Sequence, residues 1–342
     1  MKPQRLTLPA LLGFCLLTIA VSLRFGAVQV PILCAWSSLW PSAASQPSLG
    51  CPDAELARAV LSLRLPRVVL AVCVGSGLGL SGAALQALFR NPLVDPGLIG
   101  VSSGAALFAA ALMVLGSGVF CSPPLLLFAG FAGGLCAAIA VQRLSQVGGR
   151  VLVPALILAG VAVNAVAGAL IGLLSYIASD AQLRGLTFWT LGSLGGATWP
   201  RVLWAGAVSL LSTILLLRQA GSLHILVLGE SAAAHLGVAT DSLKRRVLLL
   251  SVLLVASAVA LCGIVGFVGL IVPHVVRLIV GPDPRRVLPG SALLGVILLL
   301  WADLISRSAV APAELPLGIV TAALGSPFFV ALLLRERKRW AT

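Results

Sequence analysis

The sequence predicts an all-α polytopic membrane protein with about ten transmembrane helices and both termini in the cytoplasm. Hydrophobic residues make up 59% of the chain and charged residues only 10%, and the mean hydropathy is +1.10. The apolar residues form long runs, whereas a membrane β-barrel would show short segments of alternating hydrophobicity. The basic residues lie mainly between these runs, and their uneven distribution assigns a side to each connection.

Nine apolar runs are the candidate spans, judged against a hydrocarbon core of about 30 Å and a helical rise of about 1.5 Å per residue. A shorter tenth candidate covers 270–280. We expect all of them to belong to one transmembrane domain over 1–342. The nine runs are 6–23, 68–89, 98–115, 124–141, 151–178, 202–217, 247–271, 287–305 and 317–334.

The distribution of basic residues predicts the orientation. With ten spans and a cytoplasmic N-terminus, 16 of the 23 lysines and arginines lie on the inner side of the membrane. Inner connections of membrane proteins carry such an excess of lysine and arginine. The net charge of +13 therefore indicates membrane topology rather than nucleic-acid binding.

The first run resembles a signal peptide, but Arg24 stands where the small residues of a cleavage site are expected. We therefore predict an uncleaved first span. An irregular outer loop is expected over 31–62, and Cys34 and Cys51 within it can pair as a disulfide. None of the seven cysteines has a C-x-x-C spacing, so no metal site is predicted.

The second run begins with Arg64 and Arg67 on either side of Pro66. Proline suits the first turn of a helix, so we expect both arginines at the mouth of this span. Taken alone, such arginines are interfacial residues that extend to water. Gly75 and Gly79 follow at a spacing of four, which allows a second helix to approach closely.

A helix breaker, RNPLVDPG, follows this run at 90–97. Two prolines and a glycine within eight residues cannot continue a helix, so we expect a turn on the inner side. Asn91, Pro92 and Leu93 form the first part of this turn. The residues alone indicate no more than a connection between two spans.

The longest polar segment on the predicted inner side covers 224–246. Residues 231–236 are expected to form a short helix, with Gly229 before it and Gly237 ending it. An amphipathic surface loop is the simpler interpretation of this pattern.

Three glycines at a spacing of three, Gly263, Gly266 and Gly269, precede Pro273. This pattern predicts a closely packed and locally broken helix. His274 follows near the inner end of a span, where we expect a packing or capping residue rather than a ligand.

Two outer features remain. Asp303 and Arg307 are four residues apart, so they are expected to pair on one helix face. The segment 180–200 is expected to be an outer connection whose tryptophans lie at the membrane interface.

No residue pattern supplies an energy source or a catalytic site. None of the ten acidic residues lies in the middle of a predicted span, where ion-coupled carriers usually keep an ionisable group. The chain therefore also lacks the two buried aspartates that an intramembrane aspartyl protease requires. No phosphate-binding G-x-x-x-x-G-K-[ST] loop occurs either. If this protein moves a substrate uphill, the motor is a separate chain.

The stretches 63–104, 224–246, 263–277 and 302–328 resemble the FecCD-type permeases, the membrane subunits of bacterial ABC importers for vitamin B12, heme and iron–siderophore complexes. The resemblance covers nearly the whole chain. It implies a ten-span permease of the bacterial inner membrane that is not itself an enzyme. It also implies a homodimer with two ABC ATPase subunits that bind ATP, a periplasmic substrate-binding protein and membrane lipid as partners, and no cofactor bound by this chain.

The resemblance also assigns roles to residues. The arginines that receive glutamates of the binding protein correspond to Arg64, Arg67 and Arg307. The helices that begin at Pro66 and cover 151–178 are expected to line part of the passage. The family's second gate position, before the fifth span, matches poorly here. The element that docks into the ATPase subunit corresponds to Gly229, Glu230, Ser231, His235, Leu236 and Gly237, and the inner gate to Asn91, Pro92 and Leu93.

Heme is the first expected cargo, followed by a ferric siderophore and then cobalamin. The chain has only three histidines, one tyrosine and two methionines, so we expect no tight ligation of heme iron. The alternative from another class is an ion-coupled secondary transporter. That alternative requires uptake driven by a proton or sodium gradient without an ATPase partner.

Overall fold

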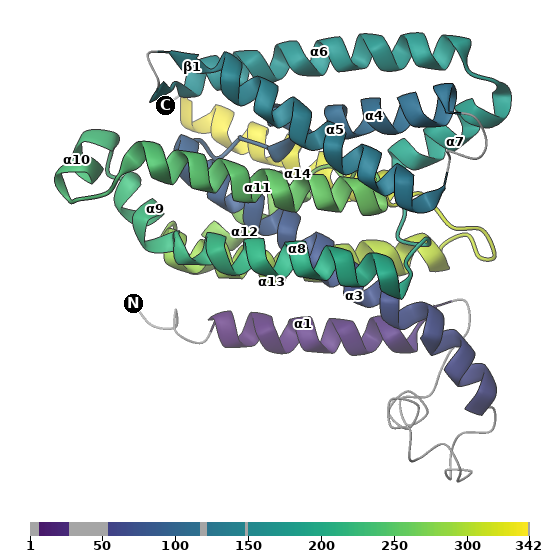
Figure 1. Cartoon of the computed structure of the whole chain (residues 1–342). Coiled ribbons are helices and arrows are strands. Elements are labelled where there is room, and N and C mark those ends of the chain that lie inside the picture. The colour runs from purple at the N-terminus through teal and green to yellow at the C-terminus, as the bar shows by residue number, and fades with distance from the viewer. Residues whose placement is uncertain (1–6, 27–53, 117–121, 148–149, 341–342) are drawn as a thin grey trace.

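The protein is a bundle of helices (Figure 1), described by the computed structural model over residues 7–26, 54–116, 122–147 and 150–340. The first helices are α1 (Thr7–Arg24), α3 (Ala54–Phe89), η2 (Pro96–Ile99), α4 (Val101–Leu115) and α5 (Pro123–Leu144). A two-residue antiparallel hairpin, β1 (Gln146–Val147) and β2 (Arg150–Val151), leads to α6 (Val153–Ile177) and α7 (Asp180–Leu191). The remaining helices are α8 (Trp199–Arg218), α9 (Ala220–Leu226), α10 (Glu230–His235), α11 (Thr240–Cys262), α12 (Val268–Val280), α13 (Pro284–Ser308) and α14 (Leu317–Trp340).

The predicted all-α polytopic fold is confirmed. Within the described residues, seven helices are long and apolar enough to cross a membrane, namely α1, α3, α5, α6, α8, α11 and α13. Three shorter apolar helices, α4, α12 and α14, accompany them. The predicted run 247–271 is divided, because α11 ends at Cys262 and α12 begins at Val268.

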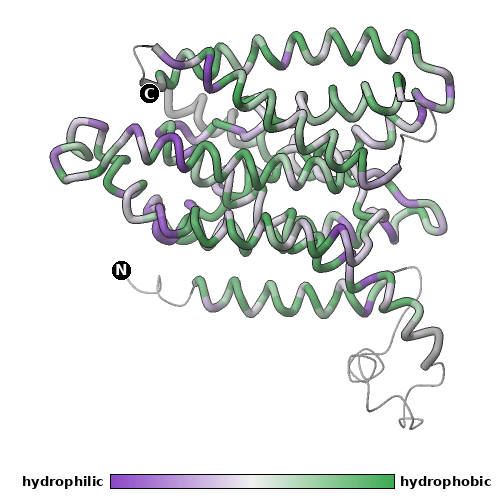
Figure 2. The backbone as a smooth tube through the Cα atoms, viewed as in Figure 1, coloured by the Kyte–Doolittle hydropathy of each residue, from purple (hydrophilic) through white to green (hydrophobic). Residues whose placement is uncertain are grey.

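The bundle has two polar ends. The start of α1, the end of α14 and the whole of α10 lie at one end, and α7 lies at the other (Figure 1). Hydrophilic residues gather at these ends and hydrophobic residues fill the middle (Figure 2). We call them the α10 end and the α7 end. The assignment of the α10 end to the cytoplasm stays a prediction.

Helix α3 forms the centre of the bundle. In the apolar stretches of α3 and α11, 78% of the residues are buried, against 22% in α6 and 17% in α1. Two glycines bring α13 directly onto α3. A Cβ atom at Gly75 would lie 2.6 Å from the carbonyl oxygen of Gly295, and one at Gly79 would collide with the carbonyl oxygen of Ser291. Such backbone contact is typical of small residues in membrane helices.

The predicted start of the second span is wrong. Helix α3 begins at Ala54, so Pro66 lies inside the helix and residues 54–62 are helical rather than irregular. The proline removes one backbone N–H donor, but the helix continues through it, and the residues after it are largely buried. The predicted pairing of Cys34 with Cys51 lies outside the described residues.

Helix α7 was not expected from the sequence. It begins with a capping box in which the Gln182 amide N–H donates to Ser179 Oγ (3.4 Å) and the Ser179 N–H donates to Gln182 Oε1 (2.9 Å). Two helix-terminal donors are thereby satisfied. The Ser-x-x-Gln spacing was the signal in the sequence that could have predicted this helix.

The three glycines after α11, at 263, 266 and 269, differ in how closely other atoms approach them. Gly263 has a φ of +74°, and a Cβ there would collide with the carbonyl oxygen of Trp189. A Cβ at Gly269 would lie 2.7 Å from Cδ of Pro96. Nothing lies within 4 Å of a Cβ at Gly266, so the expectation of close packing is wrong there. Residue 266 lies in the non-helical break, where no helix faces it.

Candidate functional site

An ionic cluster at the α7 end joins α3, α13 and the α13–α14 connection. Arg67 Nε donates to Asp303 Oδ1 at 2.8 Å. Its two terminal nitrogens donate to the two carboxylate oxygens of Glu314, Nη1 to Oε1 at 2.7 Å and Nη2 to Oε2 at 2.9 Å. A bidentate arginine–carboxylate pair fixes the orientation of both groups. We call Arg64, Arg67, Asp303, Arg307 and Glu314 the arginine cluster.

The other two arginines of the cluster hold the end of α1. Arg64 Nη1 donates to the carbonyl oxygens of Leu23 (2.8 Å) and Arg24 (3.1 Å). Arg307 Nη2 donates to the carbonyl oxygen of Ser22 and to its hydroxyl oxygen. Only 8% of Arg64 and 7% of Arg307 is exposed. In the single chain, these guanidinium groups therefore face the protein more than the solvent.

The predicted pair between Asp303 and Arg307 is present. Arg307 Nε lies 3.4 Å from Asp303 Oδ2, at the expected spacing of four residues. Asp303 itself is 1% exposed, so it is a buried carboxylate between two guanidinium groups. The sequence did not indicate that Arg67 and Glu314 complete this network.

We expect the stabilising effect of Glu314 to disappear in acid. The hydrogen bonds from Arg67 lower the pKa of the Glu314 carboxyl below its usual value of 4.5. A carboxyl group whose pKa is lower in the folded state stabilises the fold above its unfolded pKa. That contribution is lost as the pH falls through the folded pKa. The difference in melting temperature between the wild type and Glu314→Gln should therefore be largest near pH 7 and shrink below about pH 4.5.

Asp180→Asn is the matched control for this prediction. Asp180 is an acidic residue at the same end of the bundle and has no ion pair within the described part of the chain. The control should show little pH-dependent difference from the wild type. A Glu314→Gln effect that stays constant down to about pH 3 would contradict the predicted role of this ion pair.

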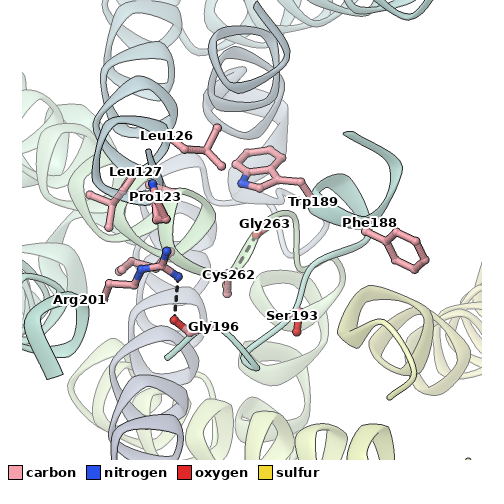
Figure 3. A pocket seen from close by; sticks show the side chains of 12 residues that line it. Pro123, Leu126, Leu127, Phe188, Trp189, Ser193, Gly196, Arg201, Cys262 and Gly263 are labelled. Carbon is pink, nitrogen blue, oxygen red and sulfur yellow. Dashed lines mark hydrogen bonds between the residues drawn. The ribbon is translucent and has the colours of Figure 1, made fainter. Parts of the chain in front are cut away.

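A pocket of about 180 Å³ lies near the arginine cluster, among α5, α7, α8 and the end of α11 (Figure 3). Its wall includes the indole ring of Trp189 and the guanidinium group of Arg201, which donates to the carbonyl oxygen of Gly196 at 2.7 Å, whereas the ring of Phe188 points away (Figure 3). Such a wall suits an apolar surface that carries an anionic group. The sequence predicted interfacial tryptophans here, but Trp189 is half-buried and packs beside Gly130.

At the α10 end, α9 and α10 form a protruding segment. Gly229 (φ +121°) precedes α10 and Gly237 (φ +82°) follows it, so the predicted short helix is present between two backbone conformations that favour glycine. Glu230 Oε2 accepts a hydrogen bond from Lys244 Nζ at 2.7 Å, which ties α10 to the start of α11. Ala233 is fully buried, so one side of α10 packs against the rest of the protein.

The outer surface of this segment carries exposed apolar and polar side chains. Leu228 is 69% exposed and Leu236 is 62% exposed, and Ser231 and His235 also face solvent. Exposed apolar groups within a polar surface are typical of a protein–protein contact. The contact between His224 Nδ1 and Asp283 Oδ1 (3.0 Å) joins this segment to the start of α13.

The predicted turn after α3 is also at the α10 end. Helix α3 ends at Phe89, and Asn91 Oδ1 accepts a hydrogen bond from the Leu93 N–H at 2.9 Å. This local bond stabilises a turn in place of further helix. Leu93 is 44% exposed, and Asn91 and Pro92 line a pocket of about 320 Å³ together with Val227 of the α9–α10 segment.

Candidate metal ligands are scattered. No group of three or more histidine, cysteine, aspartate or glutamate residues within the described ranges is arranged to hold a metal ion. His274 packs edge to face on Phe328, with ring centroids 5.9 Å apart, as expected for a packing residue.

Comparison with known proteins shows the family. The sequence profile of the FecCD transport family matches residues 14–335. The chain is 48% identical over 284 residues to the hemin transport system permease protein HmuU of Yersinia pestis, which covers 82% of this chain and 84% of that protein. It is 41% identical over 304 residues to the cobalamin import system permease protein BtuC of Halobacterium salinarum, with coverage of 89% and 80%.

Comparison of the three-dimensional structure supports the same family assignment. The structure is similar to a metal-chelate type ABC transporter solved in an inward-facing conformation, with a TM-score of 0.83 and 33% identity over 96% of this chain and 99% of that chain. The seven long and three shorter apolar helices of the described residues are consistent with a membrane permease, and the family profile matches nearly the whole sequence. The chain is therefore a multi-pass membrane permease that belongs to the FecCD transport family.

Proposed function

We propose that this chain is the permease subunit of an ATP-driven importer that moves heme from a periplasmic binding protein into the cytoplasm. The observation that supports heme is the identity of 48% to a hemin permease, compared with 41% and 39% to cobalamin and vitamin B12 permeases. Cobalamin is the second candidate because several relatives are permeases for it, and a ferric siderophore is the third.

The energy would come from two ATPase subunits that bind the α9–α10 segment. The exposed side chains of Leu228 and Leu236 support this proposal, because they can form an apolar contact with another protein. The Glu230–Lys244 ion pair would transmit a movement of α10 to α11. A carrier driven by an ion gradient is less well supported, since the buried acidic group of α13, Asp303, lies near one helix end and is paired with arginines.

The binding protein would dock at the arginine cluster on the α7 end. Carboxylates on its two lobes would meet Arg64, Arg67 and Arg307, and such contacts favour orientation and fast association. In the isolated chain these arginines are mostly covered. An incoming carboxylate would therefore displace Glu314, which is 42% exposed, before it reaches Arg67.

The passage would run between two copies of this chain. Helix α6 has the surface for this role, because only 22% of its apolar stretch is buried and Leu158, Val166 and Leu173 are each more than half exposed. Helix α3 was expected to line the passage too, but this chain's own helices cover most of its surface. We assign the inner gate to the turn at Asn91, Pro92 and Leu93.

Reconstitution tests the proposal. The chain, purified together with its ATPase partner, is placed in proteoliposomes and supplied with a binding protein loaded with hemin, cobalamin or a ferric siderophore. We expect ATP-dependent hemin uptake. Uptake of cobalamin or of the ferric siderophore without uptake of hemin would show that the proposed cargo is wrong. Uptake driven by a proton or sodium gradient without an ATPase would contradict the function itself.

A further inference from the structure

A buried glutamine connects the end of α3 to α12 and to the turn that follows α3. Gln86 is 3% exposed. Its amide Nε2 donates to the carbonyl oxygens of Val94 (3.1 Å), Gly269 (3.3 Å) and Leu270 (3.3 Å). Its Oε1 accepts a hydrogen bond from Arg277 Nη2 at 2.6 Å. One side chain of α3 therefore contacts two other segments of the chain, the turn and α12.

The chemistry of these contacts requires a neutral amide. The –NH₂ group faces carbonyl oxygens and the carbonyl oxygen faces a guanidinium group, so both halves of the amide are used. A glutamate at this position would direct a carboxylate oxygen toward three carbonyl oxygens. An apolar residue would leave the buried polar groups without this partner, at a cost in stability.

The backbone around Gln86 is packed tightly. A Cβ atom at Gly82, one turn earlier in α3, would collide with the carbonyl oxygen of Gly269. The opposite side of Gly269 meets the ring of Pro96, which begins η2. The start of α12 is therefore held between α3 and η2. A displacement of α12 would also move the connection at 90–95.

The far end of α12 leads to the α9–α10 segment. Helix α12 ends at Val280, and Asp283 then caps α13 by accepting a hydrogen bond from the Arg285 N–H at 2.9 Å. The same Asp283 pairs with His224 of α9 at 3.0 Å. The pocket of about 320 Å³ lies between the turn and Val227, and the side chain of Arg90, at the start of the turn, approaches Gly229 of the segment.

We propose that Gln86, oriented by Arg277, is a positioning residue that transmits a displacement of α12 to the turn at Asn91, Pro92 and Leu93. This inference rests on the proposed gate role of that turn and adds the residue that controls it. When the α9–α10 segment moves, the His224–Asp283 contact would displace the start of α13, and the short connection 281–283 would pass this displacement to α12. The Gln86 amide is hydrogen-bonded both to the turn and to the backbone of Gly269 and Leu270. The turn would therefore move together with α12.

Hydrogen exchange in the complete complex tests this inference without knowledge of the cargo. The transporter with its ATPase subunits is compared in the nucleotide-free state and with ATP and vanadate, and amide exchange is measured over residues 90–95. We expect the exchange rates of the wild type to differ between the two states by about threefold or more. In Gln86→Met, which keeps the length of the side chain, this difference should disappear while ATP hydrolysis is retained.

The control is Gln219→Met. Gln219 also lies at the α10 end, between α8 and α9, and within the described residues its side chain donates a hydrogen bond to the carbonyl oxygen of Leu215 in the adjoining helix α8, at 3.4 Å. This variant should keep the wild-type difference. If Gln86→Met does not assemble, Arg277→Gln provides the second test, because it removes the guanidinium group that orients the amide.

The outcomes separate the inference from the proposed function. A nucleotide-dependent difference that survives in both Gln86→Met and Arg277→Gln would overturn the role of Gln86 and leave the gate assignment intact. A wild type whose turn exchanges equally in both states would contradict the gate itself, and the role of Gln86 with it. An equal loss of the difference in Gln219→Met would show a general structural effect and would also overturn the inference.

Discussion

Arg67→Met is expected to lower the free energy of unfolding by about 3–5 kcal/mol, because it leaves a buried charge without its main partner. Asp303 is 1% exposed and receives its shortest contact, 2.8 Å, from Arg67 Nε. After the substitution it retains Arg307 at 3.4 Å. Glu314 also loses its bidentate partner. Methionine fills a similar length, so the loss arises from charge rather than from a cavity.

The measurement is thermal unfolding in detergent, with Arg184→Met as the matched control. Arg184 is an exposed residue of α7 with no ion pair among the described residues, so its replacement should change the melting temperature little. The double variant Arg67→Met/Asp303→Asn should recover part of the lost stability, since it removes the buried charge as well. If Arg67→Met is no more destabilising than Arg184→Met, the cluster does not hold the fold together.

This result matters for docking experiments on the cluster. Charge reversal at Arg64 or Arg67 is a direct test of docking, but the structure shows that Arg67 balances two carboxylates of its own chain. A weakened docking signal from such a variant could arise from partial unfolding. Glu314→Gln is the sharper variant for docking, because it removes the competitor for Arg67 and leaves the buried Asp303 paired.

Hydropathy and small local motifs accounted for most of the fold. The apolar runs predicted the spans, and Gly229 and Gly237 predicted the ends of α10, because the signals for these features lie within a few residues of each other. The same reasoning placed Pro66 at a helix start, since proline is common there. In the structure the helix instead extends back to Ala54, twelve residues before Pro66.

The candidate sites were less accessible to sequence reasoning. The Asp303–Arg307 pair was predicted because its members are one helical turn apart. Arg67 is 236 residues from Asp303 and 247 from Glu314, and no periodicity in a single sequence connects such distant positions. Gln86 is a similar case, because its partners on α12 lie more than 180 residues away.

The second large effect is expected at Gly82. Gly82→Ala should destabilise the protein by about 3 kcal/mol, at the upper end of the usual range for overpacking. The added methyl group would collide with backbone atoms of Gly269, and a backbone cannot move aside as a flexible side chain can. Helix α12 would have to separate from α3, which would also lengthen the hydrogen bonds from Gln86 to Gly269 and Leu270.

Gly77→Ala, on the same helix, is the matched control and should not destabilise the protein. A Cβ at Gly77 would lie 3.3 Å from Cδ2 of the buried Leu254, so the end of one side chain has to shift by only a few tenths of an ångström and no backbone atom has to move. Alanine also restricts the unfolded chain more than glycine does, so this variant should be neutral or stabilising by up to about 1 kcal/mol. Thermal unfolding of the two variants in parallel measures the contrast. Equal effects at both positions would mean that α12 yields at Gly269, and that the backbone contact there does not hold α12 in place.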